Sequence, residues 1–208
     1  RDLVRSRGLG DVYKRQMQSD HGYKDYPEEI DEAIHGIITE LSFRRGETIS
    51  ALADMRNNLY YVISGAARAF YLHGGKEHTY SFAFNGEFIT LSHSLLADSN
   101  YLTTIEFLES TSIAMIPLDG MQNLLKSFSH KGAEKIMEEI LKNLHQHMVH
   151  LEDRILMLQT YSAKERYEWI IKRYPQILER ANLTQIASYL GMTKETLYRI
   201  RSGKYKPT

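Results

Sequence analysis

The spacing of the apolar residues changes markedly close to Gly120. Before that point, from about Phe43 to Pro117, short β-branched and aromatic runs alternate with turn residues, at the spacing of roughly 8–12 residues that is typical of antiparallel sandwiches and barrels. After it, apolar residues recur every three or four positions, which is the pattern of helices. We therefore expect an α+β chain, in which an antiparallel β-roll of the jelly-roll type is followed by helices.

Four runs are expected to form strands of this β-roll, at residues 59–63, 66–72, 78–84 and 103–107. Turn residues separate the runs. The pair Gly74-Gly75 is typical of a tight hairpin loop, because glycine adopts a positive φ without steric cost. The runs and turns together predict a compact antiparallel unit.

The first 40 residues fall into two parts. Residues 1–16 begin without Met, show no apolar periodicity and precede Met17, so we expect them to be a leader that is not native to the protein. Pro27, followed by two Glu residues, predicts the start of a helix. Its apolar positions, spaced by three or four residues, are Ile30, Ile34, Ile37, Ile38 and Leu41. This helix should pack on the rest of the chain.

Composition excludes several classes of protein. The chain of 208 residues contains no cysteine, which excludes disulfides, thiolate metal sites and cysteine nucleophiles. It has no apolar stretch near the ~18 residues of a membrane span and no apolar signal core, so we expect a cytoplasmic protein with no membrane partner. Residues 17–160 carry a net charge of −9, whereas residues 161–208, with ten Lys or Arg against four Glu, carry +6. The basic segment favours a polyanion-binding module, with a solvated helical surface as the alternative.

A long helix is expected from about Lys131 to Gln159, or roughly 44 Å. Its apolar residues form a heptad-like stripe: Met137, Ile140, Leu144, Met148, Leu151, Ile155 and Leu158. Such a stripe is longer than a small neighbouring β-roll can cover. We therefore expect this helix to pair with a second copy in a two-fold homodimer, and packing on the β-roll alone is the alternative.

Residues 182–204 have the pattern of a helix-turn-helix. Asn182 can cap a first helix whose third position is Gln185, and Gly191 can end that helix in a left-handed turn. Thr193 can then cap a second helix. Apolar side chains at positions 186, 190, 192, 197 and 200 should hold the two helices together. An ordinary helical hairpin is the alternative, but it does not predict a basic outer face on the second helix.

The outer face of the second helix carries the candidate DNA contacts. Glu195 and Arg199 are the candidates for reading bases, because Glu can accept from cytosine N4 and Arg can make two hydrogen bonds to guanine. Contacts to phosphates, which position the helix without choosing a sequence, are expected of Thr193, Lys194, Tyr198, Arg201 and Lys204. Each of these side chains could equally be solvated, and Glu195 in a first turn stabilises a helix without any DNA.

The order of these elements resembles the CRP/FNR family of bacterial transcription regulators over residues 17 to about 206. The matching segments are Leu59-Tyr60-Tyr61-Val62-Ile63-Ser64-Gly65, Gly75-Lys76-Glu77, Gly86-Glu87-Phe88-Ile89, and Leu190-Gly191-Met192-Thr193-Lys194-Glu195-Thr196-Leu197-Tyr198-Arg199-Ile200. The resemblance implies a cyclic nucleotide-binding-like sensor domain at residues 17–120, a dimerisation helix at 121–160 and a DNA-binding domain at 161–208. It also implies RNA polymerase as a candidate partner.

The expected effector pocket departs from the cyclic AMP-binding members of that family. In those members a Gly-Glu-Leu segment binds the ribose and an Arg-Ser pair binds the phosphate, whereas this sequence has Thr90-Leu91-Ser92 and Tyr101-Leu102 at those places. A buried phosphate without a paired cation is strongly disfavoured. We therefore expect an effector other than cyclic AMP, or none, and we expect Arg68 to lie on the surface of a strand.

The other polar clusters do not form a convincing catalytic or metal site. His145, His147 and His150 are spaced by two and three residues, which does not bring all three to one helix face, so solvent-facing positions are expected. His73 and His78 lack the companion ligands of a metal-binding barrel. No nucleophile elbow or phosphate-binding glycine loop is present. We expect no catalytic residue, no metal and no cofactor.

The sequence thus predicts a dimeric, sequence-specific DNA-binding transcription regulator that reads an inverted repeat. Regulation would act through a hinge near Tyr161-Ser162-Ala163 that reorients the recognition helices. Two alternatives stay open. The first is a ligand-binding or scaffold dimer whose helical tail binds protein rather than DNA, and the second is a metal-dependent barrel enzyme.

Overall fold

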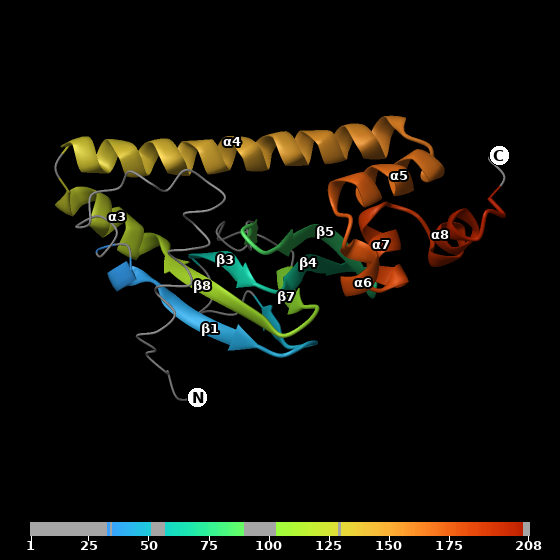
Figure 1. Cartoon of the computed structure of the whole chain (residues 1–208), viewed down its shortest axis with the longest axis horizontal. Coiled ribbons are helices and arrows are strands. Elements are labelled where there is room, and N and C mark those ends of the chain that lie inside the picture. The colour runs from blue at the N-terminus through green and yellow to red at the C-terminus, as the bar shows by residue number, and fades with distance from the viewer. Residues whose placement is uncertain (1–32, 34, 51–56, 90–102, 129, 206–208) are drawn as a thin grey trace.

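The computed structural model describes residues 33, 35–50, 57–89, 103–128 and 130–205. Its β-roll consists of two antiparallel four-stranded sheets, with the strand orders β1-β8-β3-β6 and β2-β7-β4-β5 (Figure 1). The strands are β1 Thr39–Phe43, β2 Thr48–Ser50, β3 Asn58–Ser64, β4 Ala66–His73, β5 Lys76–Phe84, β6 Phe88–Ile89, β7 Thr103–Phe107 and β8 Thr111–Pro117. The predicted antiparallel roll followed by helices is confirmed.

Alternating side chains of these strands fill the interior of the roll, because successive residues of a strand point to opposite faces. Tyr60 and Val62 on β3 face Ala67 and Ala69 on β4 across this core. The remaining fully buried members of the same cluster are Ile49, Ala83, Ile89, Ile105, Phe107 and Ile113. The side chains between them, such as Arg68 and Phe82, therefore point to the outer face of the second sheet.

The predicted hairpin at Gly74-Gly75 is confirmed. Both glycines have a positive φ, 59° and 74°, in the turn that joins β4 to β5. Two consecutive residues with positive φ match the right-handed twist of the flanking strands, and glycine is the residue that adopts this turn most easily. The turn aligns His73 opposite Lys76 and so fixes the register of the hairpin.

The predicted helix at the N-terminal side of the roll ends earlier than its apolar spacing indicated. Residues 33 and 35–37 are helical, but Leu41 belongs to β1 and pairs with Ile113 of β8. Thr39, Leu41 and Phe43 also alternate as a strand requires, and pairing with β8 decides between the two patterns. The rest of that expected helix and the expected leader at residues 1–16 lie outside the described residues.

The helices follow in one continuous series: α3 Leu118–Ser127, α4 His130–Thr160, α5 Ala163–Arg173, α6 Ile177–Arg180, α7 Leu183–Tyr189 and α8 Lys194–Arg201. α4 has 31 residues and matches the predicted long helix closely. It runs along one side of the molecule above the β-roll in the view of Figure 1, with α3 near its start and α5 near its end. None of the helices in the described ranges combines the length and apolarity needed to cross a membrane.

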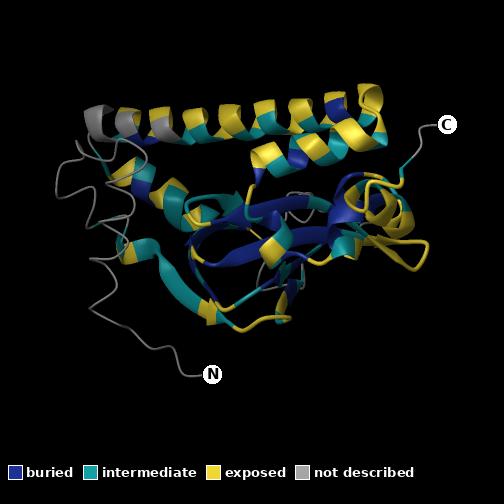
Figure 2. Cartoon of the chain, turned by 45° about the vertical axis from the view of Figure 1, so that its right-hand side comes forward, coloured by how far each residue is buried: buried dark blue, intermediate teal, exposed yellow. Residues whose placement is uncertain are grey.

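α4 is packed near its two ends. Near its start, Ile136 is buried in a cluster with Leu124 of α3. Near its end, Met157 is buried in the core that surrounds α7. The opposite side of the helix is exposed over much of its described length (Figure 2).

The helix-turn-helix and the roll share one hydrophobic core. Phe82 and Phe84 on β5 lie in the same cluster as Ile186 and Tyr189 on α7. The ring centroids of Phe82 and Tyr189 are 5.2 Å apart. The roll therefore contacts α7 directly as well as being linked to it through α4.

Candidate nucleic-acid interface

The caps predicted for the two C-terminal helices are confirmed. Asn182 Oδ1 accepts from the Gln185 backbone N–H at 3.0 Å, and Gln185 Oε1 accepts from the Asn182 N–H at 2.9 Å, which completes a capping box at the start of α7. Thr193 Oγ1 accepts from the Thr196 N–H at 3.1 Å at the start of α8. These side chains satisfy N–H groups that have no partner within their helix.

The turn between α7 and α8 depends on Gly191, which has a φ of 62°. Its N–H donates to the Ser188 carbonyl at 3.2 Å, and the next N–H, of Met192, donates to the Ala187 carbonyl at 3.0 Å. A Cβ at position 191 would lie 3.0 Å from Leu158 of α4, which is tighter than ordinary packing. The turn therefore requires glycine for its backbone conformation and for close packing against α4.

The predicted inward face of the helix pair is confirmed. Ile186, Leu190 and Leu197 have no exposed side-chain surface, and Ile200 is partly buried. Trp169 of α5 packs against the same core and stacks on Tyr189 with 6.5 Å between ring centroids. The two helices are thus held in place by one hydrophobic cluster, which Trp169 of α5 also joins.

The side chains that the sequence assigned to DNA lie on the surface of α8 and just beyond it. All are exposed: Thr193, Lys194, Glu195, Tyr198, Arg199, Arg201 and Lys204. Tyr198 is 62% exposed, which is unusual for an aromatic side chain. The Thr193 hydroxyl also caps α8, so any contact that it makes with a phosphate would be in addition to this capping bond. The surface combines three positive charges of α8 with the single carboxylate of Glu195.

Arg166 of α5 links the end of α4 to the turn between α7 and α8. Its guanidinium donates to the Leu158 carbonyl at 2.7 Å and the Tyr161 carbonyl at 2.9 Å, both at the end of α4. It also donates to the Leu190 carbonyl at 3.2 Å, in the turn. The predicted hinge at residues 161–163 coincides with the break between α4 and α5, where Ser162 and Glu165 form a capping box.

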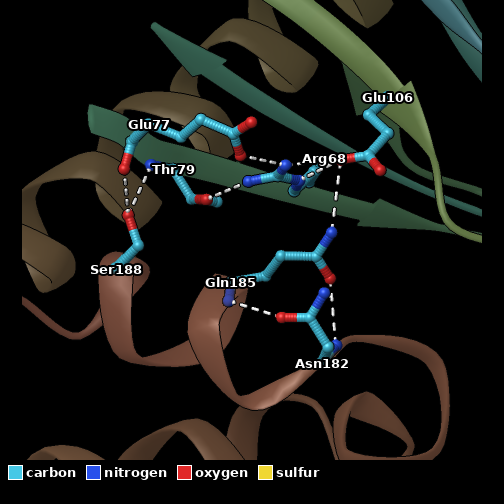
Figure 3. A network of polar contacts seen from close by, with 7 residues as sticks. All are labelled: Arg68, Glu77, Thr79, Glu106, Asn182, Gln185 and Ser188. Carbon is cyan, nitrogen blue, oxygen red and sulfur yellow. Dashed lines mark hydrogen bonds and ion pairs between the residues drawn. The ribbon is translucent and has the colours of Figure 1, made fainter. Parts of the chain in front are cut away.

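The expected surface position of Arg68 is wrong. Its side chain is only 4% exposed and lies on the outer face of β4, on the side of the sheet that faces α7 (Figure 3). The guanidinium forms ion pairs with Glu77 and Glu106, and donates to Thr79 Oγ1 at 3.0 Å. The paired carboxylates and the cover of α7 bury the arginine. Glu77 is nine residues away on the next strand, whereas Glu106 and α7 come from parts of the chain that are more distant in sequence.

Two α7 side chains reach this group (Figure 3). Ser188 Oγ accepts from the Thr79 N–H and donates to the Glu77 carbonyl, both at 2.9 Å. Gln185 Nε2 donates to Glu106 Oε2 at 3.2 Å. Sequence reasoning missed these contacts, because their partners are 79 to 111 residues apart and no motif marks them.

The predicted stripe on α4 lies largely in solvent in the single chain. Its exposed members are Met137, Leu144, Met148, Leu151 and Ile155, whose exposed fractions range from 36% to 58%. Ile140 instead packs against the cluster of α3, and Leu158 packs against the core of the helix-turn-helix. Leu141, which is 58% exposed, completes the stripe, with steps of four, three, four, three and four residues. This is the heptad spacing of a helix-pairing seam.

The five residues expected at the effector pocket, Thr90, Leu91, Ser92, Tyr101 and Leu102, lie outside the described residues. The described interior of the roll is lined by apolar and aromatic side chains. Within it, burial raises the pKa of Tyr60 to about 12. Arg68 points away from that interior, and its charge is matched by Glu77 and Glu106.

The expected solvent-facing position of the α4 histidines is wrong for His150. Its Nε2 lies 3.3 Å from the hydroxyl oxygens of both Tyr174 and Tyr189. Burial, followed by the nearby charge of Arg173, lowers the pKa of His150 to about 4. Among the described residues, no group of three or more His, Asp or Glu side chains is placed to hold a metal ion.

Comparison with known proteins places the roll in a defined class. Residues 40–128 match the cyclic nucleotide-binding domain family. A search of curated protein sequences gave no match.

Three solved structures share the arrangement of most of the chain. FixK2 from Bradyrhizobium japonicum is 24% identical, with a TM-score of 0.62 over 80% of this chain and 84% of that chain. The c-di-GMP responsive global regulator CLP of Xanthomonas campestris is 15% identical, with a TM-score of 0.67 over 85% and 91%. A transcriptional regulator of the CRP/FNR family from Eubacterium rectale is 17% identical, with a TM-score of 0.56 over 86% and 83%. The predicted resemblance to CRP/FNR regulators is confirmed at the level of the fold.

Proposed function

We propose that the protein is a homodimeric, sequence-specific DNA-binding transcription regulator of the CRP/FNR type. The observation that carries this proposal is the packing of α7 and α8. Leu197 is fully buried, whereas Arg199 and Glu195 on the same helix are exposed on a basic surface. This is the arrangement of a recognition helix that enters the major groove while its partner helix supports it. The fold shared with known transcription regulators supports it further.

The exposed stripe on α4 supports a homodimer in which the α4 helices pair. Isolated exposed apolar residues are common on protein surfaces, but six in heptad spacing on one helix face indicate an interface. A two-fold dimer presents two α8 helices to successive major grooves about 34–36 Å apart. The target is then an inverted repeat. In this proposal any effector differs from cyclic AMP.

Two substitutions on the α8 surface test DNA binding. The operator is first selected from genomic fragments with the purified wild-type protein. Arg199→Ala is expected to relax base preference at one position of each half-site, at a cost of about 1–3 kcal/mol. Lys204→Ala is expected to weaken binding to all duplexes alike and to lower the slope of log affinity against log salt by about one unit. Fluorescence anisotropy over a range of salt concentrations measures both effects.

Lys76→Ala provides the control, because Lys76 is an exposed lysine on the β4–β5 hairpin of the roll. It should leave both affinity and salt slope unchanged. If neither α8 substitution alters binding to any duplex, the surface does not contact DNA, and a scaffold whose tail binds protein becomes the better account.

A further inference from the structure

The contact between α7 and the β-roll has a polar centre that DNA binding does not use. β5 is an edge strand of its sheet, so the backbone groups on its open side lack a neighbouring strand. Ser188 of α7 satisfies two of them with one hydroxyl, which accepts from the Thr79 N–H and donates to the Glu77 carbonyl. Arg154 of α4 donates to the Thr79 carbonyl beside them. The open edge of β5 is thereby closed by side chains from the helical part of the chain.

Gln185 makes a second connection and has two roles at once. Its Oε1 completes the capping box with Asn182, and its Nε2 donates to Glu106 of β7. The side chain is 8% exposed, so water competes little for these bonds. The first turn of α7 is therefore fixed at the same time to its own cap and to the sheet.

Arg68 holds the groups that α7 binds. Its guanidinium pairs with the carboxylates of Glu106 and Glu77 and donates to Thr79 Oγ1 (Figure 3). A charge buried to this degree is stable only when it is paired and hydrogen-bonded. The acceptor of Gln185 and the strand edge that receives Ser188 are thus set by one buried side chain.

We propose that Gln185 and Ser188 are positioning residues that fix the orientation of the helix-turn-helix on the β-roll, and that Arg68 holds their acceptors in place. The apolar contact between Phe82 and Tyr189 provides burial, but burial has no preferred direction. Directed hydrogen bonds at two points along the sheet-facing side of α7 select one angle from those that the apolar contact allows. The consequence for DNA binding rests on the function proposed above.

In this docked arrangement the DNA-facing side chains of α8 all remain exposed. In this proposal the docked state is the one that binds DNA, because it leaves these side chains accessible to a duplex. Two recognition helices held at a fixed spacing lose less conformational freedom on an operator than two loosely attached ones. The operator requires one spacing of the two recognition helices, whereas unrelated DNA can be bound with many spacings. Docking should therefore raise affinity for the operator more than affinity for unrelated DNA.

Gln185→Glu is the sharpest test. Glutamate retains the acceptor of the capping box, since Glu is as suitable as Gln at that position. It replaces the amide that donates to Glu106 with a carboxylate that repels it. The matched control is Thr184→Glu, which adds the same charge to the exposed side of the same helix turn. Any effect of negative charge on DNA binding in general is then common to both variants.

The first measurement is amide hydrogen exchange of the full protein without DNA. Gln185 makes no bond to Thr79, so faster exchange at the Thr79 amide in Gln185→Glu reports a movement of α7 as a body. We expect exchange about tenfold faster than in the wild type, and an unchanged rate in Thr184→Glu. An unchanged rate in both variants overturns the positioning role.

The second measurement is the ratio of operator affinity to affinity for an unrelated duplex. We expect this ratio to fall about tenfold in Gln185→Glu relative to Thr184→Glu. Ser188→Ala removes no buried apolar group, so it serves as a second variant if the first fails to fold, and its ratio should fall about threefold. An unchanged or higher ratio overturns the assignment of the docked state to DNA binding. If the wild-type protein selects no duplex, the proposed function fails, and hydrogen exchange alone decides the positioning role.

Discussion

Burial gives His150 a chemistry that differs from that of a surface histidine. Its ring lies between α4 and the tyrosines of two other segments, with Nε2 3.3 Å from each of the two hydroxyl oxygens. Desolvation is the main reason that its pKa falls from 6.5 to about 4, and the positive charges of Arg173, His147 and Arg154 act in the same direction while Asp153 opposes them. The ring is therefore neutral at pH 7.

This lowered pKa predicts that acid destabilises the protein through His150. Between pH 6.5 and about 4 the unfolded chain binds a proton that the folded chain does not, so the free energy of unfolding decreases as the pH falls through this window. The contribution is complete above pH 6.5. Because the ring is partly exposed, solvent screening limits the effect to about 1–2 kcal/mol. Urea unfolding of wild type and His150→Gln at several pH values measures it.

His150→Gln should show a shallower loss of stability over this pH range. His145→Gln is the control, because His145 lies on the exposed side of the same helix. Parallel curves for wild type and His150→Gln would show that the proton equilibrium of this ring does not contribute to stability.

At the scale of elements, the junction of α4 and α5 connects the long helix to the helix-turn-helix. Arg166 connects the last carbonyls of α4 with the carbonyl of Leu190 in the turn after α7. A guanidinium offers five N–H donors in a fixed plane, so one side chain can span these elements, whereas an ammonium acts as a single compact point of charge. The junction therefore depends on arginine in particular and on more than its charge.

Arg166→Lys is expected to lower the free energy of unfolding by about 1–2 kcal/mol, because it keeps the favourable charge at the end of α4 but cannot reach all four carbonyls to which the guanidinium donates. Urea denaturation measures the change. Lys164→Ala is the control, since its ion pair with Glu168 is 67% and 61% exposed and should contribute little. A loss in Arg166→Lys no larger than in this control would show that the junction does not depend on the guanidinium.

Elements defined by local signals could be predicted from the sequence. Asn182, Gln185 and Thr193 mark helix starts through their own neighbours, and Gly74-Gly75 marks a hairpin in the same way. The assignment of Leu41 to the N-terminal helix is wrong, because its spacing fits both a helix and a strand until β8 pairs with it. The side chains of α8 that the sequence assigns to DNA contacts are exposed as expected, and their contacts with DNA stay a prediction.

At the scale of the whole molecule, the outer side of α4 carries a stripe of six apolar side chains that are exposed in the part of the chain that the structure describes. Leu144→Glu and Met148→Glu each place a charge at the centre of the stripe. We expect either substitution to convert the dimer to a monomer at micromolar concentration, because a buried unpaired charge costs several kcal/mol at each of two symmetric positions. Sedimentation equilibrium measures the mass.

Leu156→Glu is the matched control. Leu156 is 52% exposed on the same helix but lies outside the heptad stripe, so its substitution should leave the mass unchanged. A wild-type protein that sediments as a monomer, or a dimer that survives both stripe substitutions, would exclude pairing through α4.

The relation between the roll and the helix-turn-helix could not be predicted from sequence. Arg68, Glu106 and Gln185 lie on three separate elements, and each by itself has the pattern of an ordinary surface residue. Only the folded arrangement brings them together and buries the arginine. His150 was misplaced for the same reason, because the tyrosines that cover it follow 24 and 39 residues later.

The stacking of Trp169 on Tyr189 also provides an optical signal. Trp169 is the single tryptophan of the chain, and Tyr189, on which it stacks, contacts Phe82 of the roll on another side. Indole emission is sensitive to the polarity and packing around the ring. Changes in the colour or brightness of this intrinsic fluorescence would therefore report movement at this junction in real time, without any dye attached to the protein.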